Sequence, residues 1–211
     1  MNGGNYMNSI IFDLDGTLWD STAVIADAWN EVLKERHMDE PHITVPLLKT
    51  LFGKTLPDIA AAAFPNLSKP NQLELVETCC DREHEFLLRH GSPLYPHLLE
   101  VLEYLSAKYS LFIVSNSQAG YIEVFLKVTK LGKYFKDHLC AGDTGNPKGD
   151  NIREIMTRNQ LASSVYVGDT DGDHQAAREA GVPFVFASYG FGQTKAEDYR
   201  ISNLRDLIKL F

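Results

Sequence analysis

Two aspartates separated by one residue follow an apolar run near the start of the chain. Residues 10–12 are isoleucine, isoleucine and phenylalanine, and Asp13, Asp15 and Gly16 lie in the next four positions. An apolar run that ends in polar residues and a glycine predicts a buried strand leading into a turn. In open α/β sheets, ligands bind beyond the carboxyl ends of the strands. We therefore expect the carboxylates of Asp13 and Asp15 in an active site.

Three other segments place polar side chains where a strand pattern ends or a helix pattern begins. Each segment by itself is also typical of a turn or a helix cap. Their occurrence together, in the order that a parallel sheet requires, favours one shared site. The side chains concerned are Ser115, Asn116, Lys148, Asp169 and Asp173.

These residue types are suited to phosphoryl transfer with a divalent cation. Neighbouring carboxylates repel one another and also repel a phosphate dianion, and Mg²⁺, which binds carboxylates, water and phosphate oxygens, relieves both repulsions. Lys148 adds a compact positive charge, and Ser115 and Asn116 can donate hydrogen bonds to phosphoryl oxygens. Asp13 can attack phosphorus, while Asp15 can alternate between acid and base. The predicted cofactor is therefore Mg²⁺.

Strand and helix patterns alternate through most of the chain and would position these residues. This alternation predicts an α/β fold, with a Rossmann-like three-layer core in which helices cover both faces of a parallel sheet. The strands expected after the first are 111–115, 138–141, 164–168 and 183–187. The helices expected with them are 97–109, 119–129, 149–159, 172–180 and 204–210.

The interval 20–91 interrupts the alternation, because it contains helical patterns and no convincing strand. It is too long for a plain loop. We interpret it as a helical cap subdomain inserted after the first strand, with residues 1–19 and 92–211 forming the catalytic core. The expected cap helices, which prolines start or stop, are 22–37, 45–52, 57–64 and 70–90.

Composition excludes several classes of protein. The 211 residues carry a formal net charge of -8 and show no lysine and arginine cluster, which is against a nucleic-acid binder. No apolar run approaches the roughly 18 residues of a membrane span. Residues 1–6 are polar, which is against a secretory signal, and three cysteines form no disulfide framework. We expect a cytoplasmic protein with reduced thiols.

Taken together, the motifs resemble the haloacid dehalogenase-like hydrolase superfamily, in the subfamily with a helical cap after the first strand that includes phosphoglycolate phosphatase-like enzymes. The resemblance covers the chain from about residue 8 to residue 210. The motifs are Asp13-Leu14-Asp15-Gly16-Thr17, Ser115-Asn116, Lys148, Gly168-Asp169-Thr170-Asp171-Gly172-Asp173 and Tyr189-Gly190-Phe191-Gly192.

The resemblance implies a role for the two N-terminal aspartates. Asp13 would be the nucleophile that forms an aspartyl-phosphate and would also contact the metal. Asp15 would be the general acid and base, with its backbone carbonyl on Mg²⁺. Dehalogenases of the superfamily lack an acid at the position of Asp15, so its presence indicates phosphate chemistry rather than cleavage of a carbon–halogen bond.

The resemblance also implies roles for the other matching residues. Ser115 and the backbone of Asn116 would bind phosphate, and Lys148 would bridge nucleophile and phosphate. Asp169 would bind Mg²⁺, and Asp173 would bind it directly or orient its water. One departure is that glycine follows Lys148, where many relatives have proline.

The leading hypothesis is a Mg²⁺-dependent phosphatase that acts on a small phosphorylated metabolite. The cap would close over the site, with hinges near 18–20 and 91–95. Lys54, in a loop between two cap helices, is the cap residue best suited to contact an anionic substrate. The alternative interpretation, a lysine that is only exposed to solvent, is at least as common. We expect Trp29 and Phe52 in the cap core.

Two alternatives remain open at this point. A phosphosugar mutase would share the first half-reaction and return phosphate to the substrate, and it would require a bisphosphate activator. A non-catalytic regulatory relative would bind Mg²⁺ without turnover. We expect no nucleic-acid or membrane partner, and the sequence allows a monomer or a homodimer.

Overall fold

The computed structural model describes residues 7–38 and 40–211, so the expectation about a secretory signal at residues 1–6 lies outside the described residues. Within them, six parallel strands form one sheet in the order β3-β2-β1-β4-β5-β6. The chain order reverses between β1 and β4, and ligands of open α/β sheets bind at such a reversal. The strands are β1 (Ser9–Phe12), β2 (Ser110–Ser115), β3 (Phe135–Cys140), β4 (Ser164–Gly168), β5 (Phe184–Ala187) and β6 (Tyr199–Ile201).

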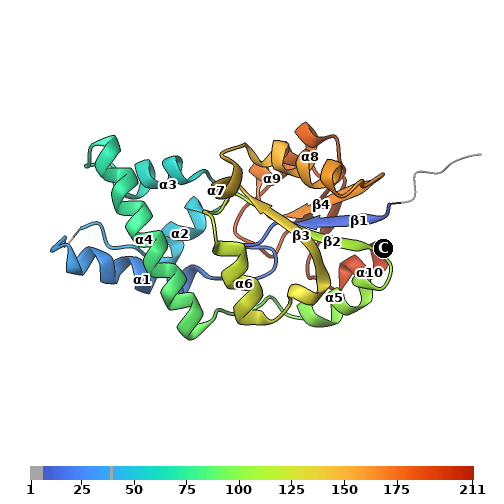
Figure 1. Cartoon of the computed structure of the whole chain (residues 1–211), viewed down its shortest axis with the longest axis horizontal. Helices are drawn as coiled ribbons and strands as arrows, with labels where there is room; N and C mark the ends of the chain where they lie inside the picture. The colour runs from blue at the N-terminus through green and yellow to red at the C-terminus, as the bar shows by residue number, and fades with distance from the viewer. Residues whose placement is uncertain (1–6, 39) are drawn as a thin grey trace, which may run out of the picture.

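Alternating side chains of the strands enter two separate apolar cores, one on each face of the sheet. In β1, Ile10 and Phe12 join the core beneath α5 (Leu98–Ser106), α6 (Tyr121–Thr129) and α10 (Asp206–Leu210). Figure 1 shows these three helices on one face of the sheet. Ile11 joins the core beneath α8 (Lys148–Arg158) and α9 (Asp171–Ala180) on the opposite face. The three-layer core predicted from the sequence is confirmed.

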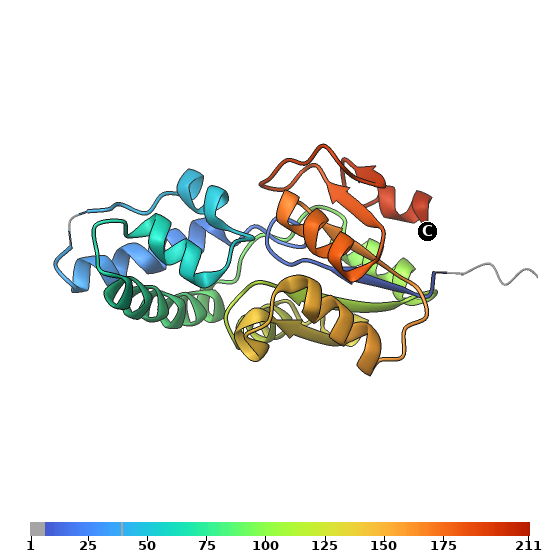
Figure 2. The ribbon, with the colours of Figure 1, turned by 90° about the horizontal axis from the view of Figure 1, so that it is seen from above.

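Four helices between β1 and α5 form the inserted cap, beyond one edge of the core (Figure 2). Proline occupies the first turn of three of them, where its missing N–H costs nothing. The inserted helical cap predicted as part of the fold is confirmed, while its boundaries at 20 and 91 stay predictions. The helices are α1 (Thr22–Glu35), α2 (Val45–Leu51), α3 (Leu56–Ala63) and α4 (Lys69–His90).

The two segments that join cap and core lie side by side and are hydrogen-bonded to each other. The Asp20 amide donates to the Pro93 carbonyl at 3.0 Å, and the Tyr95 amide donates to the Leu18 carbonyl at 3.0 Å. Trp19 also forms an isolated antiparallel β-bridge with Leu94 of the second segment. A paired ribbon at the junction ties the cap to the end of β1, where Asp13 and Asp15 lie.

Several boundaries differ from those that the sequence suggested. β3 begins at Phe135 rather than at 138, because the three residues after Phe135 are polar and exposed or half-buried and hide the apolar pattern. Strand β6 and the short helix α7 (Ala141–Thr144) were not predicted, since both are too short to show a periodicity. No helix within the described residues is long and apolar enough to cross a membrane.

Candidate active site

Asp13, Lys148 and Asp173 meet at the carboxyl end of the sheet. The Lys148 ammonium donates to Asp13 Oδ1 at 2.8 Å and to Asp173 Oδ1 at 2.7 Å, and all three side chains are buried. Asp13 follows β1, Lys148 begins α8 and Asp173 lies in the first turn of α9. Three elements far apart in sequence therefore place two carboxylates on one ammonium group.

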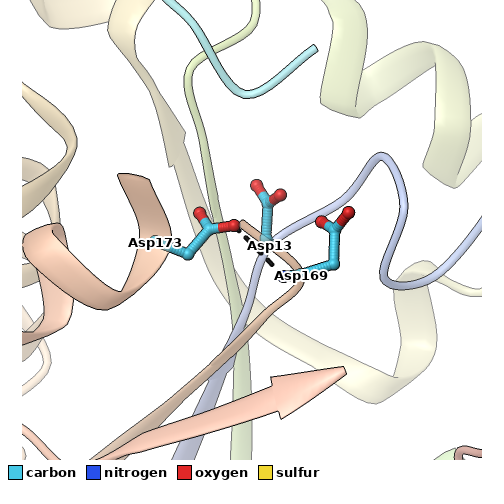
Figure 3. Close-up of side chains that lie close together, drawn as sticks. All are labelled: Asp13, Asp169 and Asp173. Atoms are coloured by element: carbon cyan, nitrogen blue, oxygen red, sulfur yellow. Dashed lines mark hydrogen bonds between the residues drawn. The ribbon is translucent and has the colours of Figure 1, made fainter. Parts of the chain in front are cut away.

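Asp13, Asp169 and Asp173 form a cluster of three carboxylates, which Figure 3 shows. Carboxylate oxygens of the three residues lie within 4.8 Å of one another. Lys148 is the one cation bonded to this cluster in the part of the chain that the structure describes. With every carboxyl ionised, the three carboxylates and Lys148 together carry a net charge of -2. A divalent cation would balance this charge and prefers oxygen ligands of this kind.

A glycine loop after β5 fixes the carboxylate of Asp169. The Phe191 amide donates to Asp169 Oδ2 at 2.7 Å, and the Thr17 hydroxyl donates to Oδ1 at 3.4 Å. A Cβ atom at Gly190 would lie 2.3 Å from the Asp169 Cβ, and one at Gly16 would lie 2.3 Å from Asp169 Oδ2. Both glycines are therefore required for the close approach of backbone to this carboxylate.

Asp173 forms a capping box with Thr170, the N-cap residue of α9, and is also the partner of Lys148. Its Oδ2 accepts from the Asp169 amide at 3.1 Å, the Thr170 amide at 2.9 Å and the Thr170 hydroxyl at 2.7 Å. Both of its oxygens are thus engaged by protein donors. Its Oδ1 receives one donor, Lys148, and keeps a second acceptor position, which can bind a metal directly or accept from a metal-bound water.

Burial raises the pKa values of the acids that carry the candidate chemistry. Desolvation, together with the charge of Asp173, raises the pKa of Asp13 to about 7, while Lys148 lowers it. Desolvation and the charges of Asp173 and Asp13 also raise the pKa of Asp169. A bound cation favours the ionised form of each group, so metal binding and deprotonation are coupled here.

Asp15 points away from the three clustered carboxylates and toward the junction with the cap. Its Oδ1 accepts from the Ser21 hydroxyl at 2.5 Å and from the Tyr121 hydroxyl at 2.9 Å. Burial raises the pKa of Asp15 to about 6, against these hydrogen bonds, which lower it. Asp13 and Asp15 therefore occupy different environments, which is how paired carboxylates acquire different roles.

Ser115 and Asn116 lie at the end of β2, on the side of the site that faces the cap. The Asn116 amide donates to the Gly53 carbonyl of the cap at 2.8 Å, and the Ser115 hydroxyl accepts from the Ser117 amide at 3.2 Å. Both residues line the cavity that contains Asp13 and Lys148. The structure thus brings the predicted phosphate-binding residues into one cavity with Asp13, the predicted nucleophile.

The glycine after Lys148 has a packing explanation. A Cβ atom at Gly149 would lie 2.9 Å from Glu179 Oε2 and 3.2 Å from the Ala176 carbonyl oxygen, both on α9. Pro147 is the N-cap residue directly before Lys148, so the backbone is still restrained on one side. Helices α8 and α9 pack closely through this glycine, and Lys148 keeps its place at the helix start.

The cavity between cap and core has an apolar wall that comes from the cap. Trp29 is buried, stacks on Phe64 with ring centroids 6.1 Å apart, and also lines the cavity. Phe52 lines the cavity as well and meets the Phe191 ring of the core at 6.1 Å. Lys54 lines the same cavity with an exposed side chain. The aromatic residues expected in the cap core thus also face the site.

Sequence reasoning missed several residues around this site. Ser21 and Tyr121 were not predicted, although both donate to Asp15, Ser21 from six positions away and Tyr121 from 106. Phe191 lies in a motif that carried the resemblance, but sequence reasoning assigned it no role at Asp169. Glu83 was also missed, although the sequence does contain a signal for it: it is an acid on the face of α4 where most residues are apolar and buried. A charged residue at such a position indicates a specific partner or ligand.

The comparisons with known proteins agree with this geometry. The sequence matches the family described as haloacid dehalogenase-like hydrolase over residues 10–187. The phosphoglycolate phosphatase of Aquifex aeolicus is 28% identical over 217 residues, which cover 97% of this chain and 96% of that protein.

Solved structures give the same result for the fold. A haloacid dehalogenase-like hydrolase from Streptococcus pneumoniae has a TM-score of 0.85 and 25% identity, and the match covers 97% of this chain and 98% of that one. A protein from Haemophilus somnus, described as a predicted phosphoglycolate phosphatase, has a TM-score of 0.83 and 23% identity, with 99% of each chain covered. The chain belongs to the haloacid dehalogenase-like hydrolase family, as its motifs predicted.

Proposed function

We propose that the protein is a Mg²⁺-dependent phosphatase that hydrolyses a small phosphorylated metabolite through an aspartyl-phosphate. The observation that supports this most directly is the buried cluster of Asp13, Asp169 and Asp173 around Lys148 at the end of the sheet. Relatives named phosphoglycolate phosphatase support phosphate-ester hydrolysis as the reaction class. A second carboxylate, Asp15, supplies the acid and base that hydrolysis of an ester requires.

In the first half-reaction, one carboxylate oxygen of Asp13 attacks phosphorus, and the bond from phosphorus to the substrate oxygen breaks. Protonated Asp15 gives its proton to that departing oxygen, so that an alcohol leaves. Lys148, Ser115 and the Asn116 backbone neutralise or hydrogen-bond the phosphoryl oxygens. Mg²⁺, when bound by Asp13, Asp169, the Asp15 carbonyl and Asp173 or its water, supplies positive charge for the phosphate.

In the second half-reaction, water attacks the phosphorus of the aspartyl-phosphate. Ionised Asp15 accepts a proton from that water, the acyl–phosphate bond breaks, and Asp13 is regenerated as a carboxylate with release of inorganic phosphate. The different surroundings of Asp13 and Asp15 support this division of roles. The pKa of Asp15, raised to about 6 by burial, suits a group that must both give and accept a proton.

The cap is proposed to open and close about the paired segments near 18–20 and 91–95. In this structure the Asn116 amide reaches the cap carbonyl of Gly53, so cap and core are in contact over the site. Closure would exclude water while the aspartyl-phosphate forms, and opening would release the alcohol. Lys54, exposed on the wall of the cavity, is proposed to attract the anionic substrate as it enters.

The test is phosphate release from a panel of phosphorylated metabolites, with Mg²⁺ and with EDTA. We expect release from one or a few compounds in the presence of Mg²⁺, and none in EDTA. The Asp13→Asn variant should fold normally and release phosphate only at background rate. Metal-independent release, or release by Asp13→Asn at a rate close to that of the native protein, would contradict the mechanism.

A further inference from the structure

Glu83 is a buried acid in the cavity wall opposite the catalytic core, and the mechanism does not use it. It lies on α4 of the cap with 4% of its surface exposed. The Trp29 indole donates to its Oε2 at 2.7 Å, and the Gln118 amide of the core donates to its Oε1. Asp13, Asp15 and Glu83 line the same cavity.

The neighbours of Glu83 include no positive charge. Its hydrogen-bond donors are an indole and an amide, and within the described residues no lysine, arginine or histidine forms an ion pair with it. His84 bonds to the same Gln118 amide, and burial lowers its pKa, which favours the neutral ring. Desolvation and the charge of Asp15 raise the pKa of Glu83 to about 8.

A carboxylate in this position retains the ability to accept further hydrogen bonds. Each oxygen has two acceptor positions, and each receives one protein donor here. Burying the ionised form of Glu83 without a cation is costly, and an ion pair or a charge-assisted hydrogen bond with a bound cation would offset that cost. The side chain lines the cavity, so a bound molecule can supply that cation.

The core side of the cavity near Glu83 is polar, with Ser117, Gln118 and Tyr121, whereas the cap side is mostly apolar. Ile25, Trp29 and Ile59 all line it from the cap. The cationic residues on the wall are Lys148, which is engaged by Asp13 and Asp173, and Lys54, which is exposed to solvent. A carboxylate at the Glu83 end would meet two acids, Glu83 and Asp15, and no buried cation.

We propose that Glu83 binds a positively charged, hydrogen-bond-donating group on the leaving alcohol, so that the preferred substrates are phosphate monoesters of small amino alcohols. This inference rests on the proposed phosphatase function and names its substrate class. The phosphoryl group lies at Asp13 and Lys148, the methylene groups contact the apolar wall, and the ammonium group donates to Glu83. The interaction is made within a desolvated cavity, where charge-assisted bonds are strongest.

Three two-carbon phosphate esters test the proposal, because they differ mainly in the charge of the leaving group. The esters are phosphoethanolamine, ethyl phosphate and phosphoglycolate, with p-nitrophenyl phosphate as a general phosphatase substrate. We expect kcat/KM for phosphoethanolamine to exceed that for ethyl phosphate by about 10- to 100-fold, the value of one hydrogen bond to a charged group. Phosphoglycolate should be the poorest of the three.

The Glu83→Gln variant tests the residue itself. It should reduce the ratio of kcat/KM between phosphoethanolamine and ethyl phosphate by at least about tenfold. Glu74→Gln makes the same charge change on an exposed part of α4 and should leave the ratio unchanged. Thermal unfolding of each variant checks the fold, and calorimetric Kd values for the same esters with Mg²⁺-loaded Asp13→Asn separate binding from turnover.

The possible failures are distinguishable. If the protein prefers phosphoglycolate and the Lys54→Gln variant loses that preference, the assignment of Glu83 is overturned. That result would favour an anionic leaving group bound by Lys54. Equal kcat/KM for phosphoethanolamine and ethyl phosphate would also overturn it. Absence of turnover on all four esters, with release from another compound of the metabolite panel, would overturn this inference alone. Absence of release from the whole panel would contradict the phosphatase function, and the inference that rests on it would fall as well.

Discussion

Lys148 and its two carboxylate partners are the residues on which the charge balance of the site depends. The ammonium is buried between Asp13 and Asp173, and their charges raise its pKa against the opposing effect of desolvation. A buried ion pair contributes little net stability, but loss of one partner leaves an uncompensated charge. The arrangement is therefore better explained by chemistry at Asp13 than by stability of the fold.

Asp15 offers a test of acid catalysis at the level of one side chain. Asp15→Asn keeps the size of the group and removes its titration, so turnover should fall most for substrates with poor leaving groups. We expect a loss of about 10²- to 10⁴-fold with an alkyl phosphate and a smaller loss with p-nitrophenyl phosphate. Steady-state kinetics with both substrates measures the difference. Equal losses would argue that Asp15 does not protonate the leaving oxygen.

Gly190 offers a test of how closely the backbone must approach Asp169. In Gly190→Ala the new methyl group would lie 2.5 Å from Asp169 Oδ2 and 2.4 Å from the Gly16 carbonyl oxygen, so the carboxylate must move. Mg²⁺ affinity, measured by calorimetry, should fall by at least about tenfold, the lower range for displaced supporting groups. Gly172→Ala, whose Cβ would have an ordinary contact at 3.5 Å, is the matched control. Unchanged affinity in Gly190→Ala would count against Asp169 as a ligand.

At the scale of elements, α4 links the cap interior to the site. Its buried face holds Leu75, Val76, Cys79 and Leu87, and Glu83 lies on the same face. The helix packs against α1 and α3 within the cap, and Glu83 contacts Gln118 of the core. The same contact contributes to packing between cap and core and to the wall of the cavity.

The buried carboxyl of Glu83 should make stability fall with pH. Its folded pKa is raised to about 8 by desolvation, whereas the unfolded value is near 4.5. Between these values the unfolded chain has lost the proton and the folded chain retains it, so the free energy of unfolding declines by up to about 1.4 kcal/mol per pH unit. Below the unfolded pKa the contribution of Glu83 is fully present.

Urea unfolding of the native protein and Glu83→Gln, at pH 5 to 8 with constant Mg²⁺, measures this contribution. Asp13, Asp15 and Asp169 also titrate with raised pKa values, but they are present in both proteins. The variant should therefore have the flatter pH dependence, whatever its stability at any one pH. Parallel curves would show that Glu83 titrates near its ordinary pKa.

At the scale of the whole molecule, metal binding should stabilise the fold. The three clustered carboxylates come from the ends of β1 and β4 and from α9, so a shared cation joins parts of the core that lie far apart in sequence. Ligand binding stabilises the folded state by about 2.7 kcal/mol at a free concentration 100 times the Kd. We expect Mg²⁺ to raise the unfolding temperature by several degrees over EDTA.

The size of this Mg²⁺ effect should depend on pH, because the metal requires ionised carboxyls. The pKa of Asp13 is raised to about 7 without metal, so the shift in unfolding temperature should be larger at pH 8 than at pH 6. Differential scanning fluorimetry of the native protein and Asp169→Asn measures it, and the variant should show little shift. An equal shift in both proteins would place the metal elsewhere.

The sequence by itself determined the fold class and brought most of the candidate site to one edge of the sheet. Asp13 and Asp169 directly follow apolar strands, Ser115 ends one, and Lys148 begins a helix, so local patterns suffice to place them. Such patterns work because strand period, helix period and turn residues are encoded in neighbouring positions. The roles of these residues stay predictions until the experiments above are done.

Only the tertiary structure decided what surrounds those residues. Tyr121 donates to Asp15 across 106 positions, the cap carbonyl of Gly53 meets Asn116, and Phe191 holds Asp169. Glu83 likewise becomes part of the cavity only when α4 is placed over the sheet. Contacts of this kind depend on the packing of whole elements, which no local periodicity encodes. The reaction class could therefore be predicted from the sequence, whereas the proposal that Glu83 binds the leaving group required the tertiary structure.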